Sequence, residues 1–266
     1  MAADLDRLRQ RLAGEPSLRR THRLLLDPTM AQWPCAKAIA LDVEANRETA
    51  AAWLPAGLVG TGRARIFVAS YPASAIGIAY QEAAILLHAR HRGRPVLHCA
   101  WIVVDDDAAL ILGRELLGFP KKMATIDLTW VEGRAEARVT RRGTTLIAID
   151  LPLDIGPAPT TDGMLGVPIV NVWGLPGMPA ALLSMDVPER VREARRGAAR
   201  LTVRGSICDP LDALGIGPQT VAARSILTDL ATPPPNATGK FLPPGLRPVG
   251  LASPTWLARQ LPLRSL

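Results

Sequence analysis

Short runs rich in Val, Ile, Leu and Thr, bounded by turn residues, recur along most of the chain. Such runs are typical of β-strands. The pairs Glu132-Gly133 and Arg142-Gly143 lie between consecutive runs and are typical of hairpin turns. Hairpins in tandem predict an antiparallel sheet. The runs that predict strands are residues 36–43, 65–69, 76–89, 96–104, 123–131, 135–141, 144–151, 167–173 and 199–204.

Helical patterns are fewer and shorter. Residues 5–12 have apolar positions at helical spacing. Asn46 can cap a helix through Trp53, and the aspartates at 105–107 can cap one through Leu117; a proline follows each predicted end. We expect these helices to be peripheral to the strands or to connect them.

The chain is predicted to have three parts. Residues 1–30 form a helical arm, residues 31–231 form the β domain, and the proline-rich residues 232–266 form a mainly extended arm. Within the β domain, residues 188–200 are a further candidate helix, and we expect their arginine-rich face to be solvated.

Composition excludes general disorder and does not favour a nucleic-acid binder. The chain has 266 residues, of which 48% are apolar, enough for a substantial core. The net charge is +7, but aromatic residues make up only 4% and the arginines are scattered and partly offset by acids. We therefore expect no nucleic-acid partner.

The first residues and the cysteines indicate a cytoplasmic protein. Residues 1–10 carry several charges and lack the continuous apolar stretch of a secretory signal. Three prolines interrupt the long uncharged stretch 163–185, which predicts strand and loop instead of a membrane span. The three cysteines are odd in number and far apart, which suits free thiols in a reducing compartment. We expect no membrane partner.

Lysine is rare in this chain, which makes its position informative. Four of the 31 basic residues are lysines, and two of them, Lys121 and Lys122, directly follow Phe119-Pro120. Arginine would supply positive charge equally well, whereas lysine can lose its proton and attack a carbonyl. The pair therefore indicates nucleophilic amine chemistry, with a surface lysine pair at a turn as the alternative.

Such chemistry requires a lowered lysine pKa. A lysine with a pKa of about 10.4 is neutral in roughly one molecule in a few thousand at pH 7, so the required shift costs about 4 to 5 kcal/mol. Apolar neighbours such as Leu117, Phe119 and Met123, or a second ammonium group, act in that direction. If the pair begins a strand, the two lysine side chains point to opposite faces, and burial then dominates over repulsion.

Gly-Arg-Glu at 113–115, followed by Gly-Phe-Pro-Lys-Lys at 118–122, resembles the signature of the acetoacetate decarboxylase family. Three further segments, in the order that this family has them, support the resemblance between residues 36 and 231. These are Tyr-Gln-Glu at 80–82, the strand and Pro-Gly loop at 167–187, and the Pro-Leu and Ile-Leu-Thr-Asp-Leu segments at 210–211 and 226–230.

The resemblance implies an α+β fold that is mainly β with short helices. Its curved antiparallel sheet is expected to close into a cone or barrel with the pocket inside, and the strand count allows this. Members of the family form homo-oligomers, so we expect a homo-oligomer here.

The resemblance also implies a site. Lys121 would form a Schiff base with the ketone of a small keto acid, Lys122 would be its electrostatic neighbour, and Glu82 would face the imine and transfer protons. Arg114 and Glu115 would form an ion pair that holds the lysine loop. The residues expected to bind substrate or support the site are Arg114, Glu115, Leu117 and Phe119.

Two positions differ from the decarboxylases of this family. Their arginine near the N-terminus corresponds to Ala36 or Lys37, and a glutamate upstream of the one matching Glu82 corresponds to Phe67. Lys37 or the arginines at 19, 20 and 23 are candidates to replace the missing cation.

The leading prediction is decarboxylation of an acetoacetate-like β-keto acid. Aldol or dehydration chemistry on pyruvate-derived keto acids through the same lysine remains open, as does non-catalytic binding of a keto acid. The paired leucines at 116–117 favour a less polar pocket than a keto diacid requires.

No pattern indicates a metal or another cofactor. His88, His91, His98 and Cys99 do not have the spacing of a standard zinc site, and we expect structural histidines. The Gly60-Thr61-Gly62 segment lacks the third glycine and the following helix of a dinucleotide-binding loop.

Overall fold

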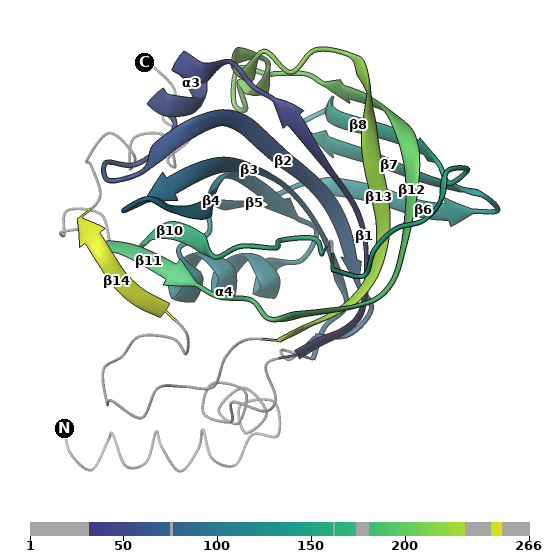
Figure 1. Cartoon of the computed structure of the whole chain (residues 1–266), viewed down its shortest axis with the longest axis horizontal. Coiled ribbons are helices and arrows are strands. Elements are labelled where there is room, and N and C mark those ends of the chain that lie inside the picture. Colours follow the sequence, from purple (N-terminus) through teal and green to yellow (C-terminus); the bar gives the residue numbers. More distant parts are fainter. Residues whose placement is uncertain (1–31, 75–76, 162, 174–180, 232–245, 252–266) are drawn as a thin grey trace, which may run out of the picture.

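A single large sheet organises the computed structural model, which describes residues 32–74, 77–161, 163–173, 181–231 and 246–251. The sheet has 14 strands in the order β14-β11-β10-β4-β3-β2-β1-β13-β12-β8-β7-β6, with β5 beside β4 and β9 beside β12. Figure 1 shows that the long strands β2, β1, β13 and β12 bend strongly, so that the sheet curves.

The described strands are β1 (Gln32–Glu44), β2 (Val59–Tyr71), β3 (Tyr80–His91), β4 (Arg94–Val104), β5 (Lys121–Met123), β6 (Thr125–Val131), β7 (Arg134–Arg141), β8 (Thr144–Pro152), β9 (Gly156–Pro157), β10 (Ile169–Trp173), β11 (Ala181–Met185), β12 (Glu189–Val203), β13 (Gln219–Ala231) and β14 (Leu246–Leu251). The described helices are α3 (Arg47–Ala52), α4 (Asp107–Leu117) and the 3-10 turn η1 (Leu211–Leu214).

The sheet is mixed, which corrects the expectation of a purely antiparallel one. Most neighbours are antiparallel, but β4 pairs in parallel with β5 and with β10, with Ile102 opposite Lys121 and Leu97 opposite Ile169. Parallel strands cannot be joined by a tight turn, and α4 forms the crossover from β4 to β5. Within the described residues the order runs from β14 to β6 without joining these ends, so closure into a cone or barrel stays a prediction.

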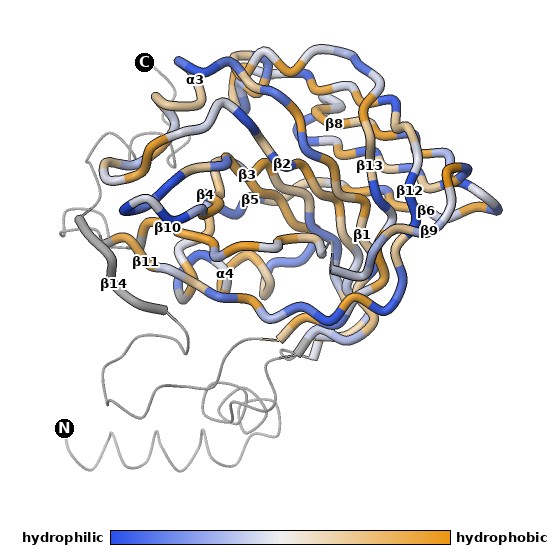
Figure 2. Tube along the Cα trace, in the orientation of Figure 1, coloured by the Kyte–Doolittle hydropathy of each residue, from blue (hydrophilic) through white to orange (hydrophobic). Residues whose placement is uncertain are grey.

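Strands β1 to β4 are buried on both faces. One face packs Ile39, Ile66 and Ile85 against Leu146 and other side chains of β6 to β8 and of η1. The opposite face carries a second cluster, which contains Phe67, Leu86, Leu97, Met164 and Leu183. Figure 2 shows apolar positions following one another along these strands, as expected for strands with two covered faces.

Residues 188–200 form most of strand β12, so the predicted helix there is wrong. The segment pairs with β13 over a long antiparallel register, from Glu189 opposite Leu230 to Leu201 opposite Gln219. A Cβ on Gly197 would lie 1.7 Å from the carbonyl oxygen of Pro152, so a glycine is required at this close approach. Long-range pairing overrides the helix-forming alanines, arginines and glutamates of this segment.

The two predicted capped helices and the two predicted hairpins are confirmed. The Asn46 side chain accepts from the Thr49 N–H at 2.9 Å at the start of α3, and Asp106 accepts from the Ala109 N–H at 3.0 Å at the start of α4. Glu132-Gly133 connects β6 to β7, and Arg142-Gly143 connects β7 to β8.

The predicted N-terminal arm, including its helix at 5–12, lies outside the described residues. Within the predicted C-terminal arm, Leu246–Leu251 form strand β14, which pairs with β11. The limits of the three predicted parts stay predictions. Among the described helices, none has the length and apolar character needed to cross a membrane.

Candidate active site

The end of a helix sets the position of Lys121. Helix α4 ends at Gly118, whose φ of 65° is a left-handed conformation that glycine adopts without strain. The N–H of Phe119 then donates to the carbonyl of Gly113 at 3.0 Å. Strand β5 follows directly and lies parallel to β4. The lysine is therefore held between a helix end and the sheet.

Glu82 and Lys121 come together although they are far apart in sequence. Glu82 lies in β3, and β4 separates that strand from β5. The Nζ of Lys121 lies 2.6 Å from Oε2 of Glu82. The two residues are 5% and 7% exposed, so the pair is largely removed from water. Burying two charges is costly unless they interact directly, as these two do.

Aromatic side chains surround this ion pair. The ammonium of Lys121 lies 5.4 Å from the ring centroid of Tyr80 and 5.8 Å from that of Phe119, within the range of cation–π attraction. The hydroxyl of Tyr71 donates to Oε1 of Glu82 at 3.4 Å, and the centroids of the Tyr71 and Tyr80 rings are 4.7 Å apart. The sequence analysis did not identify Tyr71. The sequence offers one indication of Tyr71: it lies an even number of residues from Phe67 in the same strand, so the two side chains point to the same face.

The tyrosine and cysteine side chains beside this ion pair are neutral at pH 7. Burial raises the pKa of Tyr71 and of Tyr80 well above the usual range, and the negative charge of Glu82 adds to the effect. Burial likewise raises the pKa of the Cys99 thiol, again with a contribution from Glu82. Glu82 and Lys121 therefore lie beside Tyr71, Tyr80 and Cys99 in their neutral forms.

Gly113 leaves the space that the Lys121 side chain occupies. A Cβ at this position would lie 2.5 Å from Cε, 2.6 Å from Cδ and 3.0 Å from Nζ of Lys121. Real Cβ atoms do not approach other atoms that closely. The glycine at the start of the signature thus has a steric role on the helix face against which the lysine packs.

The residues between Gly113 and Lys121 hold the chain in place. Arg114 Nη1 donates to the backbone carbonyl of Lys121 at 3.4 Å. The carbonyl of Leu117 accepts from Nδ2 of Asn171 in β10 at 3.2 Å. Glu115 is exposed on α4, and its predicted ion pair with Arg114 stays a prediction. Sequence reasoning missed Asn171, which is 2% exposed.

The face of the sheet that carries Glu82 is largely apolar. In the register of β2 and β3, Ala69 is opposite Glu82 and Phe67 is opposite Ala84, so Phe67 shares this face. Ala36 and Phe67 belong to the buried cluster that contains Tyr71 and Tyr80.

Lys37 does not supply the missing cation at this face. Its side chain is exposed, and its ammonium lies 5.6 Å from the ring centroid of Trp130. Successive residues of a strand point to opposite faces, so Lys37 points away from the face that carries Ala36. The arginines at 19, 20 and 23 lie outside the described residues.

The structure does not bring Lys122 to Lys121. The two residues open strand β5 and point to opposite faces, as the sequence analysis expected for a pair that begins a strand. The Nζ of Lys122 lies 2.8 Å from Oδ1 of Asp209, which also accepts from Nε1 of Trp101 at 2.9 Å. Burial acts to raise the pKa of Asp209, but hydrogen bonds from Lys122 and Trp101 outweigh it and hold that pKa below its usual range.

The histidines have separate partners. Nε2 of His88 lies 2.7 Å from Asp42, Nδ1 of His91 lies 3.1 Å from the carbonyl of Gly57, and Nδ1 of His98 lies 2.8 Å from that of Val170. In the part of the chain that the structure describes, no group of His, Cys, Asp and Glu is arranged to hold a metal ion.

The chain matches a family model over most of its length. Residues 25–238 match the model of the family described as acetoacetate decarboxylase. The chain belongs to the acetoacetate decarboxylase family. The match contains Gly113, Glu82 and the two lysines of β5. A search of the curated proteins found no match.

Solved structures share the fold of this family member. The acetoacetate decarboxylase of Legionella pneumophila is 17% identical, with a TM-score of 0.70 over 84% of this chain and 86% of that chain. An acetoacetate decarboxylase-like enzyme from Sphingomonas wittichii is 20% identical, with a TM-score of 0.67 over 79% of this chain and 93% of that chain.

The enduracididine biosynthesis enzyme MppR also has this fold. Its complex with the condensation product of pyruvate and imidazole 4-carboxaldehyde is 20% identical, with a TM-score of 0.67 over 81% of this chain and 87% of that chain. At these identities the similarities establish a mainly β, acetoacetate decarboxylase-like fold.

Proposed function

We propose that this family member is a carbon–carbon lyase that forms a Schiff base between Lys121 and a small keto acid. The observation that carries the proposal is the buried contact of 2.6 Å between Nζ of Lys121 and Oε2 of Glu82. A nucleophilic amine must lose a proton before it attacks, and the adjacent carboxylate can accept it directly. We propose that the reaction takes place in the cytoplasm, in a homo-oligomer.

The leading reaction is decarboxylation of an acetoacetate-like β-keto acid. Glu82 takes a proton from the Lys121 ammonium, and the amine adds to the ketone. The oxygen then leaves as water with two protons, one from the amine nitrogen and one returned by Glu82, which yields an iminium. The bond to the carboxylate then breaks, its electron pair moves into the iminium to form an enamine, and CO₂ leaves. A proton from water, delivered through Glu82, is added to the enamine carbon. Hydrolysis then releases the ketone and restores Lys121.

The apolar surroundings support loss of CO₂. Phe67 and Ala36 share the buried cluster of the site, so a substrate carboxylate there would lie near apolar side chains. The carboxylate charge disappears as CO₂ forms, and an apolar environment favours that neutralisation.

Aldol or dehydration chemistry with the same lysine is the second candidate. The structural similarity to MppR holding a pyruvate condensation product supports it. In that reaction a proton, and not CO₂, leaves the carbon beside the iminium. Glu82 is again the group placed to accept the proton.

Trapping with borohydride tests the proposal. The protein is incubated with acetoacetate or pyruvate in the presence of borohydride, and its peptides are examined by mass spectrometry. We expect a reduced adduct of substrate mass on Lys121, none in Lys121→Arg, and retention of the adduct in the matched control Lys122→Arg. Evolution of CO₂ separates decarboxylation from an aldehyde-dependent condensation.

Two outcomes would overturn the proposal. An adduct of equal yield in Lys121→Arg would show that another amine reacts. The absence of any adduct with both acids, from a folded protein, would contradict the Schiff base and leave non-catalytic keto-acid binding as the better account.

A further inference from the structure

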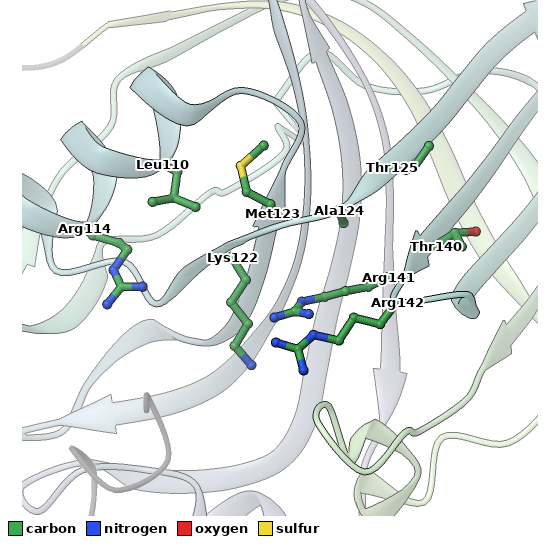
Figure 3. A pocket seen from close by; sticks show the side chains of 9 residues that line it. All are labelled: Leu110, Arg114, Lys122, Met123, Ala124, Thr125, Thr140, Arg141 and Arg142. Carbon is green, nitrogen blue, oxygen red and sulfur yellow. The ribbon is translucent and has the colours of Figure 1, made fainter. Parts of the chain in front are cut away.

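A cavity lies on the side of β5 that carries Lys122. It has a volume of about 630 Å³ and is lined by residues of α4, β5 and the hairpin that joins β7 to β8. Figure 3 shows Lys122, Arg141 and Arg142 converging on it, with Arg114 at the side and Leu110 and Met123 on another wall. Lys121 does not line this cavity.

The positive charge of the cavity exceeds the negative charge supplied to it. Arg114, Lys122, Arg141 and Arg142 line it, and none of the described residues that line it carries a carboxylate. The nearby Asp209 is shared, because Lys122 lies 2.8 Å from Oδ1 and Arg141 Nε lies 3.6 Å from Oδ2. One carboxylate therefore faces two of the four cations.

Two guanidinium groups retain the capacity to bind an anion. The buried Nε of Arg141 faces Oδ2 of Asp209 at 3.6 Å, beyond hydrogen-bond distance, and the Arg141 side chain is 11% exposed. Arg142 Nη1 donates to Sγ of Cys208 at 3.1 Å, and sulfur is a weak acceptor. The weak sulfur acceptor leaves Arg142 able to donate to an oxyanion in the cavity.

We propose that this cavity binds a small organic molecule that carries a multiply charged oxyanion, either a phosphate or a set of carboxylates. The planar guanidinium groups of Arg141 and Arg142 donate in a fork that matches such oxygens, and Lys122 adds a point charge. Leu110 and Met123 provide an apolar wall for the organic part of the ligand. The site is separate from Lys121 and does not depend on the proposed reaction.

The chain contains a matched pair of arginines for the test. Arg142 and Arg92 both precede a glycine in a hairpin turn, and both have positive φ, 50° and 49° respectively. Asparagine is favoured at this turn position, so Arg142→Asn and Arg92→Asn remove the same charge and are each expected to fold. Arg142 lines the cavity and Arg92 does not.

Calorimetric titration of the full-length protein with inorganic pyrophosphate, and separately with citrate, measures the binding. We expect saturable binding of at least one of the two anions at low salt, weaker binding as salt is added, a Kd roughly tenfold higher in Arg142→Asn, and no change in Arg92→Asn. The anion that binds more tightly assigns the site to phosphate or carboxylate ligands.

Two results would overturn the proposal. One is the absence of saturable binding of either anion by the wild-type protein. The other is an equal loss of affinity in Arg142→Asn and Arg92→Asn, because that would show attraction to the net charge of the protein and not to this cavity. A melting curve of each variant separates loss of binding from loss of folding.

Discussion

Lys121 and Lys122 are neighbours in the chain but occupy two different environments. Lys121 is 5% exposed and pairs with Glu82 among tyrosine and phenylalanine rings. Lys122 lies on the other face of β5, pairs with Asp209 and lines a cavity of positive charge. An identical side chain is thus buried in the proposed catalytic site on one face and paired at a positively charged cavity on the other.

The difference lies in what surrounds each ion pair. Asp209 accepts from Trp101 as well as Lys122, and Arg141 lies nearby, so its charge is neutralised from several directions. Glu82 has Lys121 and the hydroxyl of Tyr71 as partners, and burial keeps that tyrosine neutral. A proton that moves from Lys121 to Glu82 leaves no other charged group of this cluster unpaired. The same transfer on the other face would leave Arg141 facing a neutral acid.

Replacement of Glu82 by Gln has the largest expected effect of these substitutions. The amide cannot take a proton from Lys121 or deliver one to the enamine carbon, so we expect kcat to fall about 100-fold or more. The Lys121 adduct should form more slowly when borohydride is present, because the amine has lost its adjacent proton acceptor. Glu132→Gln, which removes an exposed carboxylate of the β6–β7 hairpin, is the control and should leave kcat unchanged. Equal kcat in Glu82→Gln and wild type would contradict the proton-transfer role.

A methyl group at Gly113 should act on Lys121 and not on Lys122. The new Cβ would lie 2.5 Å from Cε of Lys121, so we expect the amine to be displaced and kcat/KM to fall roughly tenfold. Gly217→Ala is the matched control, because no atom lies within 4 Å of a Cβ built there. Steady-state kinetics and the adduct yield measure the effect. Unaltered kinetics in Gly113→Ala would show that the close packing of this glycine does not position the lysine.

Removal of the Lys122 charge should affect stability more than activity. In Lys122→Gln, Asp209 keeps Trp101 and Arg141, and Lys122 itself is 19% exposed, so we expect a loss of about 2 kcal/mol in the free energy of unfolding. The adduct yield should stay within about twofold of wild type. Urea unfolding measures the stability, and Lys37→Gln, at an exposed lysine, is the control. A complete loss of the adduct in a folded variant would contradict this separation of roles.

The stabilising effect of Lys122 should also depend on pH. The pKa of Asp209 is lower in the folded than in the unfolded protein, so its contribution is fully present above its unfolded value of about 3.9. It is lost as the pH falls through the folded pKa. The stability difference between wild type and Lys122→Gln should therefore narrow in acid.

The sequence by itself determined the local features. The signature around Lys121, the capped starts of α3 and α4 and the turns at 132–133 and 142–143 depend on residues close together in the chain, and the structure contains each of them. Strand alternation also separated the faces of Lys121 and Lys122 once the pair was assumed to begin a strand.

Only the tertiary structure decided which distant residues meet. The pairing of 188–200 with β13 overrode a helical composition, and the parallel pairing of β4 with β5 and β10 replaced an all-antiparallel sheet. Tyr71, Asn171 and Asp209 joined their partners through contacts across strands and crossovers. Such contacts depend on register and curvature of the whole sheet, which local periodicity does not encode.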